Sequence, residues 1–475
     1  MRLRRGSRTL SCNVRKPAML AIFGLACSSG NDVLVGYNRD VATSGRPSST
    51  ASNIAGGGAL NTATQPSFGG TQSGTTTTTT SAPGTCDNGG PAVALPTLGG
   101  CTNDLAKRIF LFAICTCSDF VANASVVTEP FRASTTGFNL GASIGVNGTY
   151  RAEGAASHLG GSLWVLGNAA FEQHDVLGEL VCGSSVTVSS VSDVGRNAYV
   201  GGNLSAPNLT IDGTLSISPD AQREVKAVAG GTQFITDTTI PTPCDCRTPI
   251  DIAGVARHFR DDNDNARVSL PPSAFTATDR DVEYTLACGR YYFDSFGGTG
   301  AVSLHITGKT LIAVGGQLSN SGGITFDLAP EAELDLFIAG DLELSGMVSM
   351  GNATRPAATR VYVGGQAAFS TDLKLYANWY IPNSQLAMSA PSEFWGSLYS
   401  RSLQSAAGLT VHYDDAVLDL PSCNPAGQSC TSCHDCANPT PACRNGRCEA
   451  CAVDSDCCPP LYCHQGTCRS IPYLI

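Results

Sequence analysis

A five-residue phrase returns four times along the chain, and it limits the possible folds more than any other feature. Each copy has an aliphatic residue, two small residues, a polar residue and a second apolar residue. The copies are Val200–Leu204, Val314–Leu318, Ile338–Leu342 and Val363–Ala367, and the last three begin 24 and then 25 residues apart. A near-constant spacing with Gly at the corners is typical of a solenoid, in which only stacked coils bury a core.

The region around these copies predicts mainly β structure. From about residue 135 to 420, short runs such as Leu163–Val165 and Val186–Val188 alternate in polarity and are bounded by Gly or Asn, which is typical of strands between turns. We therefore expect a right-handed parallel β-helix over 135–420, with an insertion at about 220–300 that disulfides pin to the coils. The alternative is a β-sandwich in which the Gly-Gly turns recur by coincidence.

The N-terminus has the pattern of an export signal. Six basic residues fall within the first 16 positions, and an apolar run from Ala18 to Ala26 ends at Cys27. This run is too short to span a bilayer, and a Cys placed directly after a small residue looks like a bacterial lipoprotein signal. We expect residues 1–26 to be removed and Cys27 to be acylated, which anchors the chain to the outer membrane at the cell surface. The alternative is a secreted protein.

Two segments separate this signal from the β region. Residues 27–100 are rich in Thr, Gly, Ser and Asn, with six consecutive Thr at 75–80, and they predict a disordered low-complexity tether. Residues 101–134 predict a lead-in stapled by Cys, with a short helix over 103–121 because its apolar residues recur at roughly helical spacing. A further short helix is expected at 250–259.

Cysteine usage indicates an oxidising compartment. The chain has 21 Cys, of which Cys12 leaves with the signal, and such density outside the cytosol indicates disulfides. Nineteen candidates remain after lipidation, so one thiol is left without an intramolecular partner or is modified. The disulfide candidates are Cys86, Cys101, Cys115, Cys117, Cys182, Cys244, Cys246, Cys288, Cys423, Cys430, Cys433, Cys436, Cys443, Cys448, Cys451, Cys457, Cys458, Cys463 and Cys468.

The last of these cysteines define a small C-terminal module. Eleven Cys fall between residues 423 and 468 with little apolar material around them, so residues 421–475 predict a module held together by disulfides. The C-x2-C spacing at Cys430, Cys433 and Cys436 would suit zinc in a cytosolic protein. Export favours disulfides over zinc here.

Charge limits the partners. The chain carries 29 Lys and Arg against 39 Asp and Glu, a net charge of −10, and no basic cluster remains once the signal is removed. We therefore expect no nucleic-acid partner. The expected partners are the membrane, through the lipid, and a glycan or protein ligand.

The order of these segments resembles a family of surface lipoproteins typical of myxobacteria, a family with no activity to carry over. The likeness rests on six stretches: Arg108–Ala113, Cys244–Cys246, Asp262–Asn265, Cys288–Tyr292, Leu334–Gly340 and Val411–Asp414. The last of these, with Trp395–Tyr399, is also similar to β-solenoid domains of pilus-associated and adhesin-like exported proteins. The tail is similar to Dickkopf- or colipase-type modules through Cys451, Asp456–Cys458, Cys463 and Cys468.

Chemical motifs are few. Asp261, Asn263 and Asn265 alternate as oxygen ligands do in a calcium loop, so Ca²⁺ is the one cofactor candidate, although Ala266 replaces the turn Gly. A polysaccharide lyase or glycoside hydrolase is the enzymatic alternative, because hydrolases use carboxylate pairs. The carboxylates that could serve are Asp327, Glu331, Glu333, Asp335, Asp341 and Glu343. No catalytic residue is assigned, and we expect a non-enzymatic role in adhesion, envelope architecture or ligand binding.

Overall fold

The computed structural model describes most of the chain between residue 100 and residue 420 and part of the C-terminal module. The described residues are 94–95, 100–132, 142–154, 156–236, 240–247, 249–371, 373–420, 430, 432–433, 436, 442–457, 461–464 and 467–470. The signal, Cys27, most of the tether, Cys86, Cys423 and Cys458 lie outside them. Neither α-helix in these ranges has the length and apolarity that a bilayer span requires.

A parallel β-helix forms the main body, as the repeated phrase predicts. Each coil contributes one strand to each of three parallel ladders, which we call faces 1, 2 and 3. In spatial order, face 1 consists of β21 (Gly289–Phe293), β23 (Lys309–Val314), β26 (Glu333–Ile338), β29 (Thr359–Val363), β32 (Asn378–Met388), β34 (Leu398–Ser405), β3 (Ile114–Thr116), β6 (Ile144–Val146), β9 (Leu163–Val165), β12 (Leu180–Cys182), β15 (Ala198–Val200), β17 (Leu215–Ile217) and β19 (Thr232–Phe234).

The other two faces follow the same order, and the long strands β32, β34, β16 and β18 turn a corner and serve two faces. Face 2 consists of β24 (Leu318–Ser319), β27 (Leu342–Leu344), β30 (Ala367–Phe369), β32, β34, β4 (Phe120–Ala122), β7 (Tyr150–Ala152), β10 (Ala169–Phe171), β13 (Val186–Val188), β16 (Leu204–Ile211) and β18 (Arg223–Val228). Face 3 consists of β20 (Val282–Leu286), β22 (Val302–Ile306), β25 (Ile324–Leu328), β28 (Val348–Gly351), β31 (Leu373–Tyr376), β33 (Ser392–Trp395), β35 (Leu409–Tyr413), β5 (Val126–Pro130), β8 (Ser157–Leu159), β11 (His174–Val176), β14 (Ser192–Val194), β16 and β18.

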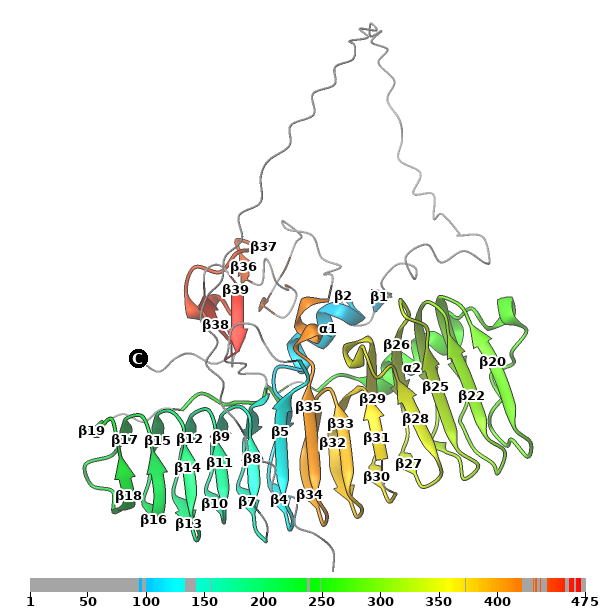
Figure 1. Cartoon of the computed structure of the whole chain (residues 1–475). Helices are drawn as coiled ribbons and strands as arrows, with labels where there is room; N and C mark the ends of the chain where they lie inside the picture. Colours follow the sequence, from blue (N-terminus) through cyan, green and yellow to red (C-terminus); the bar gives the residue numbers. More distant parts are fainter. Residues whose placement is uncertain are drawn as a thin grey trace, which may run out of the picture. The chain divides into compact units, whose positions relative to one another are not determined.

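The chain enters this solenoid in the middle rather than at an end. From β3 it winds outward to β19, passes to the far end, and winds back from β20 to β35, which lies beside β5 (Figure 1). The two halves therefore continue one another in space although residues 131–397 separate the first coil from the last in sequence. With strands about 4.8 Å apart, the thirteen strands of face 1 span about 58 Å.

Inward-pointing residues stack into apolar columns. One column on face 1 runs through Val146, Val165, Cys182, Val200 and Ile217, which are in register and fully buried. Because a parallel ladder places equivalent residues directly above one another, each coil needs an apolar side chain at the same position. Columns of this kind are the physical reason for the repeated phrase. The first residue of the phrase ends a face 1 strand in all four copies, and Val314, Ile338 and Val363 are in register with one another.

Close contact between coils explains the Gly residues of the phrase. A Cβ added at Gly340 would lie 2.8 Å from the backbone of Gly316 in the coil below, and one at Gly365 would lie 2.6 Å from the backbone of Gly340. Real Cβ atoms do not approach backbone this closely, so these two corners stack without displacement only when glycine occupies them.

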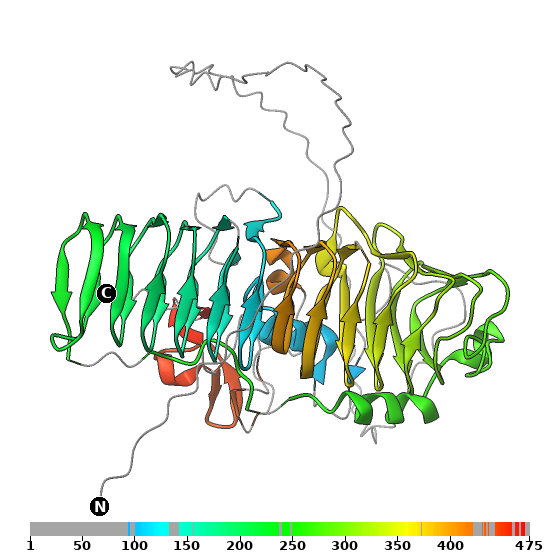
Figure 2. The same ribbon diagram turned by 90° about the horizontal axis from the view of Figure 1, so that it is seen from below.

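The two halves are joined by residues 235–281, which we call the return segment. It contains α2 (Ile252–Asp261), whose N-terminus is capped by Asp251, the side chain of which accepts a hydrogen bond from the Gly254 N–H at 2.8 Å. Helix α2 lies along face 1 (Figure 2), and Val255 and Phe259 are buried against that face. A second apolar layer thus forms outside face 1. The described strands β18–β19 and β20–β21 belong to coils, so the expected insertion at 220–300 is narrower than predicted.

The expected helix over 103–121 is correct only in its first half. Helix α1 spans Thr102–Ile109, and the chain then forms β3 and β4 of the first coil. The solenoid consequently begins at Ile114, inside the predicted lead-in. Strand pairing on both sides of β3 outweighs the roughly helical spacing of its apolar residues. Before α1, β1 (Ala94–Leu95) and β2 (Gly100–Cys101) form a small antiparallel pair.

The C-terminal module is built from two antiparallel pairs and disulfides. The pairs join β36 (Ala442–Arg444) with β37 (Arg447–Glu449), and β38 (Leu461–His464) with β39 (Thr467–Ser470). Disulfides between its described residues join Cys430 to Cys443, Cys436 to Cys448, Cys451 to Cys463 and Cys457 to Cys468. Cys433 is also disulfide-bonded, so the three thiols of the zinc alternative are all occupied.

Candidate functional site

The first and last coils meet at a seam in the middle of the solenoid. Each face contributes one pairing across it, with β3 and β4 against β34 and β5 against β35. On the three faces in turn, the donors Leu398 N–H, Leu403 N–H and Leu409 N–H reach the carbonyls of Ala113, Asp119 and Ser125 at 2.8, 3.1 and 3.0 Å. Ordinary backbone hydrogen bonds therefore join the two ends of the solenoid chain without a covalent link.

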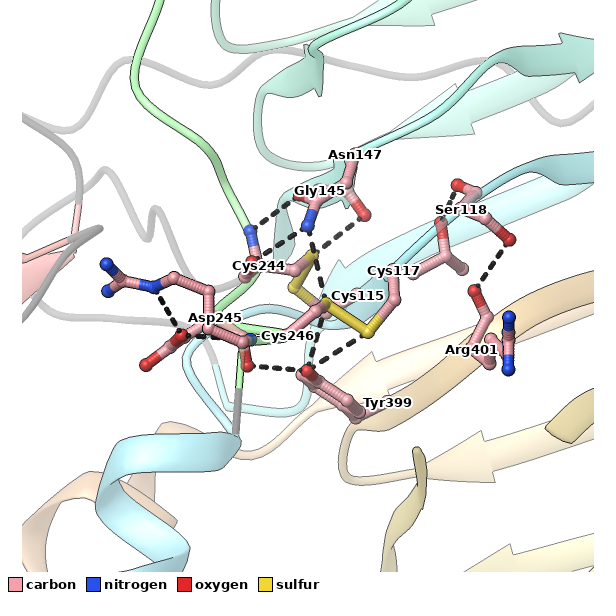
Figure 3. The surroundings of a disulfide bond; sticks show 12 residues. Cys115, Cys117, Ser118, Gly145, Asn147, Cys244, Asp245, Cys246, Tyr399 and Arg401 are labelled. Atoms are coloured by element: carbon pink, nitrogen blue, oxygen red, sulfur yellow. Dashed lines mark hydrogen bonds and ion pairs between the residues drawn. A yellow bond between two sulfur atoms is a disulfide. The ribbon is translucent and has the colours of Figure 1, made fainter. Parts of the chain in front are cut away.

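Two disulfides fasten the return segment to this seam. Cys115 pairs with Cys244 and Cys117 pairs with Cys246, each across 129 positions of sequence (Figure 3). Strand β3 alternates, so Ile114 belongs to the solenoid core while Cys115 belongs to the outer layer on face 1. The alternation therefore directs the Cys115 side chain toward the return segment.

Hydrogen bonds from neighbouring coils reinforce the disulfides. The Asn147 side chain donates to the Cys244 carbonyl at 2.8 Å and accepts from the Cys244 N–H at 3.0 Å. On the other side of the seam, the Tyr399 hydroxyl donates to the Asp245 carbonyl at 2.7 Å (Figure 3). The return segment is thus held by the coil before the seam, the coil after it and the next coil.

One position of the coil repeat makes room for this contact. Tyr399, Cys115 and Gly145 are in register on three successive strands of face 1. A Cβ at Gly145 would lie 3.1 Å from the Pro243 side chain and 3.2 Å from the Cys244 sulfur. Glycine at this position lets the return segment lie directly on the sheet.

A cavity of about 400 Å³ opens beside the disulfides. Its walls come from the end of α1 and the loop after it, from the return segment and from face 1. The lining includes Arg108, Leu111, Phe112, Asp245, Ile250, Tyr380 and Tyr399. A cavity of this size, with mostly apolar walls and a few polar groups, matches the ordinary dimensions of a small-ligand site.

The two phenols of the cavity stay protonated at physiological pH. Burial raises the pKa of Tyr380 to about 12, against the opposing effect of the Ile250 N–H, which donates to its hydroxyl at 3.3 Å. Burial also raises the pKa of Tyr399, and the charge of Asp245 adds to the rise. Groups of such high pKa can donate or accept hydrogen bonds but are poor general bases near neutral pH, so these phenols suit binding better than catalysis.

Three stretches named above for their resemblance to surface lipoproteins or to β-solenoid domains converge on this cavity. Arg108–Ala113, Cys244–Cys246 and Trp395–Tyr399 each contribute lining residues, although they are far apart in sequence. Sequence reasoning quoted these stretches as marks of architecture and did not place them together. The roles of Asn147 and Gly145 were missed, because their signal emerges only when the coils are aligned in register.

The residues of the calcium hypothesis lie at the β20–β21 end of the solenoid and take part in other contacts. Asn265 accepts a hydrogen bond from the Tyr292 N–H at 2.9 Å and donates to the Tyr292 carbonyl at 2.7 Å. Asn263 donates to the Phe259 carbonyl and accepts from the Asn265 N–H, and Asp261 forms an ion pair with Arg260. Asn265 thus acts as a cap on the exposed edge of β21. Calcium binding stays a prediction, and these contacts favour a hydrogen-bonded cap.

Two of the six carboxylates proposed for the enzymatic alternative belong to a buried ion cluster. Arg360 is fully buried and contacts Asp335 at 2.6 Å and Glu333 at 3.0 Å, while Lys309 lies 3.5 Å from Glu333. Burial opposes ionisation of Glu333, but Arg360 and Lys309 outweigh it and hold the pKa of Glu333 below its ordinary value. Arg360 and Lys309 therefore pair with these two acids, which lie in the protein interior and are not exposed to a substrate.

The other four carboxylates are placed on the outside. Asp327 contacts His305 at 3.2 Å, Asp341 accepts from the Gln366 N–H, Glu343 accepts from the Ser319 hydroxyl, and Glu331 is exposed. These contacts link neighbouring coils along the solenoid surface, as expected of a solvated outer face.

The remaining cysteine candidates divide clearly. Cys101, Cys288 and Cys433 are disulfide-bonded. Among the cysteines in the described ranges, Cys182 is the free thiol, and it occupies an inward position in the core between Val165 and Val200. Burial raises the pKa of Cys182 to about 11, so its thiol is protonated and inert at neutral pH. A free thiol at Cys182 agrees with the odd number of disulfide candidates, which leaves at least one cysteine without an intramolecular partner.

Comparison with known proteins finds one family model that is similar to part of the chain. Residues 250–420 match the family described as Domain of unknown function (DUF7305). The match runs from the second part of the return segment to the end of the last coil, and so covers one half of the solenoid. No curated protein and no solved structure matches the chain.

Proposed function

We propose that this chain is an exported, non-enzymatic protein that is lipid-anchored at Cys27 on the outer membrane. Its β-helix would act as a rigid scaffold for adhesion, envelope architecture or ligand binding. The observation that carries the proposal is the pair of disulfides, Cys115–Cys244 and Cys117–Cys246, which cross-link the return segment to the seam. Bonds of this kind persist in oxidising compartments and are rare where thiols are kept reduced.

The cavity at the seam supports the ligand-binding form of the proposal. It combines apolar walls with the Arg108 guanidinium, the Asp251 carboxylate and the Tyr399 phenol. Such a lining favours a partner with an apolar surface and a few hydrogen-bonding groups, which is the chemistry of a sugar ring or of a short peptide segment. We infer that a glycan or a protein segment is the ligand.

The location can be tested directly in the native host or a Gram-negative surrogate. Cells expressing the full chain are fractionated, each fraction is denatured in the presence of a maleimide without reductant, and the N-terminal and Cys-containing peptides are analysed by mass spectrometry. We expect a diacylglycerol-modified Cys27 in the membrane fraction and no labelling of Cys115, Cys117, Cys244 or Cys246. A Cys27→Ala variant should leave the membrane fraction. Recovery of the chain from the cytosol with reduced thiols would exclude the proposal.

Ligand binding can be tested with a glycan array and a peptide library probed with the oxidised full chain. An Ile109→Trp variant would fill the cavity, because Ile109 lines it, and should abolish any specific binding. The control is Leu177→Trp, which adds the same bulk at a residue that is 47% exposed on the solenoid surface. Binding that both variants reduce equally, or that neither reduces, would place the ligand elsewhere.

A further inference from the structure

The two ends of the solenoid are finished differently. At the β20–β21 end, the return segment places Leu270 and Phe275 over the coil that contains β20 and β21, and both side chains are buried. Phe275 stacks on Phe296 at 4.9 Å and meets the edge of Phe293 at 4.7 Å. The apolar core is therefore closed at this end.

At the β18–β19 end, the apolar columns run out into solvent. Phe234 is in register with Ile217, which is fully buried, yet Phe234 is itself 60% exposed. Val225 and Val228 likewise follow Ala206 and Ile211, and both remain partly exposed where their predecessors are buried. The coil that contains β18 and β19 thus presents inward-pointing apolar side chains, and no further coil covers them within the described residues.

The edge of this coil can also accept a strand. Within the described residues, β18 pairs with β16 alone, so its other side carries backbone groups that are open to a partner. Along β18, Glu224 and Lys226 are exposed on either side of Val225. In antiparallel pairing centred on Val225, Glu224 of each copy would face Lys226 of the other copy. Parallel in-register pairing would place like charges opposite one another.

We propose that the β18–β19 end is a docking surface for a second copy of this chain, with β18 of each copy paired antiparallel about Val225. The two-fold arrangement uses the same surface on both molecules and buries the exposed apolar side chains against each other. Because the β20–β21 end is closed by the return segment, the described part of each chain has one open end. Association therefore stops at a dimer and does not continue into a filament.

The charged residues of β18 have a second interpretation, which the structure weighs against. Charges on an edge strand are a common protection against unwanted pairing, and the Arg223 guanidinium lies 5.9 Å from the centre of the Phe234 ring. That single contact leaves most of the Phe234 side chain exposed. Glu224 and Lys226 are complementary only in the antiparallel orientation, so they direct pairing rather than block it. They lie on either side of Val225, as the polar rim of an interface surrounds its apolar centre.

The test is the mass of the oxidised full chain, measured by sedimentation equilibrium at micromolar concentration. We expect twice the mass of one chain. A Lys226→Glu variant replaces both attractive pairs with Glu–Glu repulsion, and we expect its dimer dissociation constant to rise by about tenfold or more. The double variant Glu224→Lys with Lys226→Glu restores complementarity and should restore the dimer.

An Arg401→Glu variant is the control, because it makes the same charge change at an exposed residue on β34 in the middle of the solenoid. Its dimer should match that of the unchanged chain. A monomer at all concentrations would overturn the proposal, and so would species heavier than a dimer. A dimer that resists Lys226→Glu would also overturn it, because association would then use another surface.

Discussion

At the scale of single residues, Asn265 shows how one side chain can substitute for a missing strand. Its amide accepts from the N–H and donates to the carbonyl of Tyr292, as the next coil would do. We expect Asn265→Ala to lower the free energy of unfolding by about 1–3 kcal/mol, because two buried backbone groups lose their partners. Denaturation followed by Trp fluorescence measures this loss.

The same experiment separates a cap from a calcium site. If Asn265 acts as a cap, adding Ca²⁺ or a chelator leaves the unfolding midpoint of the unchanged chain where it was, and Asn265→Ala is destabilised equally in both. A calcium site would stabilise the unchanged chain in proportion to the logarithm of the ion concentration, and the Asn265→Ala chain would lose that response.

His174 makes the solenoid sensitive to acid. It lies in the core, where the Tyr150 hydroxyl is 2.8 Å from its Nε2, and burial lowers its pKa from 6.5 to about 4. Below pH 6.5 the unfolded chain binds a proton at this residue that the folded chain does not bind. Stability is therefore lost as the pH falls from about 6.5 to about 4, by up to about 3 kcal/mol from this group.

A His174→Leu variant should show a smaller loss of stability between neutral pH and pH 4 than the unchanged chain, whatever its stability at pH 7. Urea denaturation at the two pH values gives the difference. Phe171→Leu is the matched control, since it removes apolar volume next to His174 and adds no titratable group. If both variants keep the full acid loss, the loss arises from other groups.

At the scale of elements, the turns depend on contacts between backbones. A Cβ at Gly340 would lie 2.8 Å from the Gly316 backbone, whereas a Cβ at Gly408 would meet only the Ser125 hydroxyl at 3.5 Å. We expect Gly340→Ala to cost about 1–3 kcal/mol through overpacking and Gly408→Ala to be tolerated. Thermal unfolding compares the two directly, and equal losses would show that glycine flexibility, rather than space, determines the effect.

The same contacts explain what the sequence could predict. The copies of the phrase that begin at Val314, Ile338 and Val363 contain both the inward-pointing aliphatic residue and the glycine of the narrow corner, so the solenoid was predictable from them. The predicted helix extended wrongly into residues 110–121, because the local spacing of Phe112, Ile114 and Phe120 fits a helix and a coil of the solenoid about equally well. Pairing with distant strands decides between the two, and local spacing does not contain that information.

At the scale of the whole molecule, the order of the coils was beyond sequence reasoning. The local sequence pattern of a coil is the same in two cases: when the coil stacked on it is adjacent in sequence, and when that coil is far away in sequence. The seam between β3 and β34 uses the same registered pairing as the β3–β6 contact. One sign of the arrangement in the sequence is that Cys115 and Cys244 are as far apart as Cys117 and Cys246. This equality has a meaning only when the disulfide pairing is known.

This arrangement predicts how the two disulfides at the seam share their effect. Both close a loop through the same two segments, with a separation of 129 residues each, so either one alone removes most of the loop entropy of the unfolded chain. Replacing one pair with Ala should therefore cost little, and replacing both should cost about 4 kcal/mol.

All three Trp residues, Trp164, Trp379 and Trp395, lie in the solenoid, so their fluorescence during denaturation reports this body alone. Replacing Cys451 and Cys463 in the C-terminal module is the control and should leave the Trp transition unchanged. Equal and additive losses from the two seam pairs would show that each acts through local contacts instead.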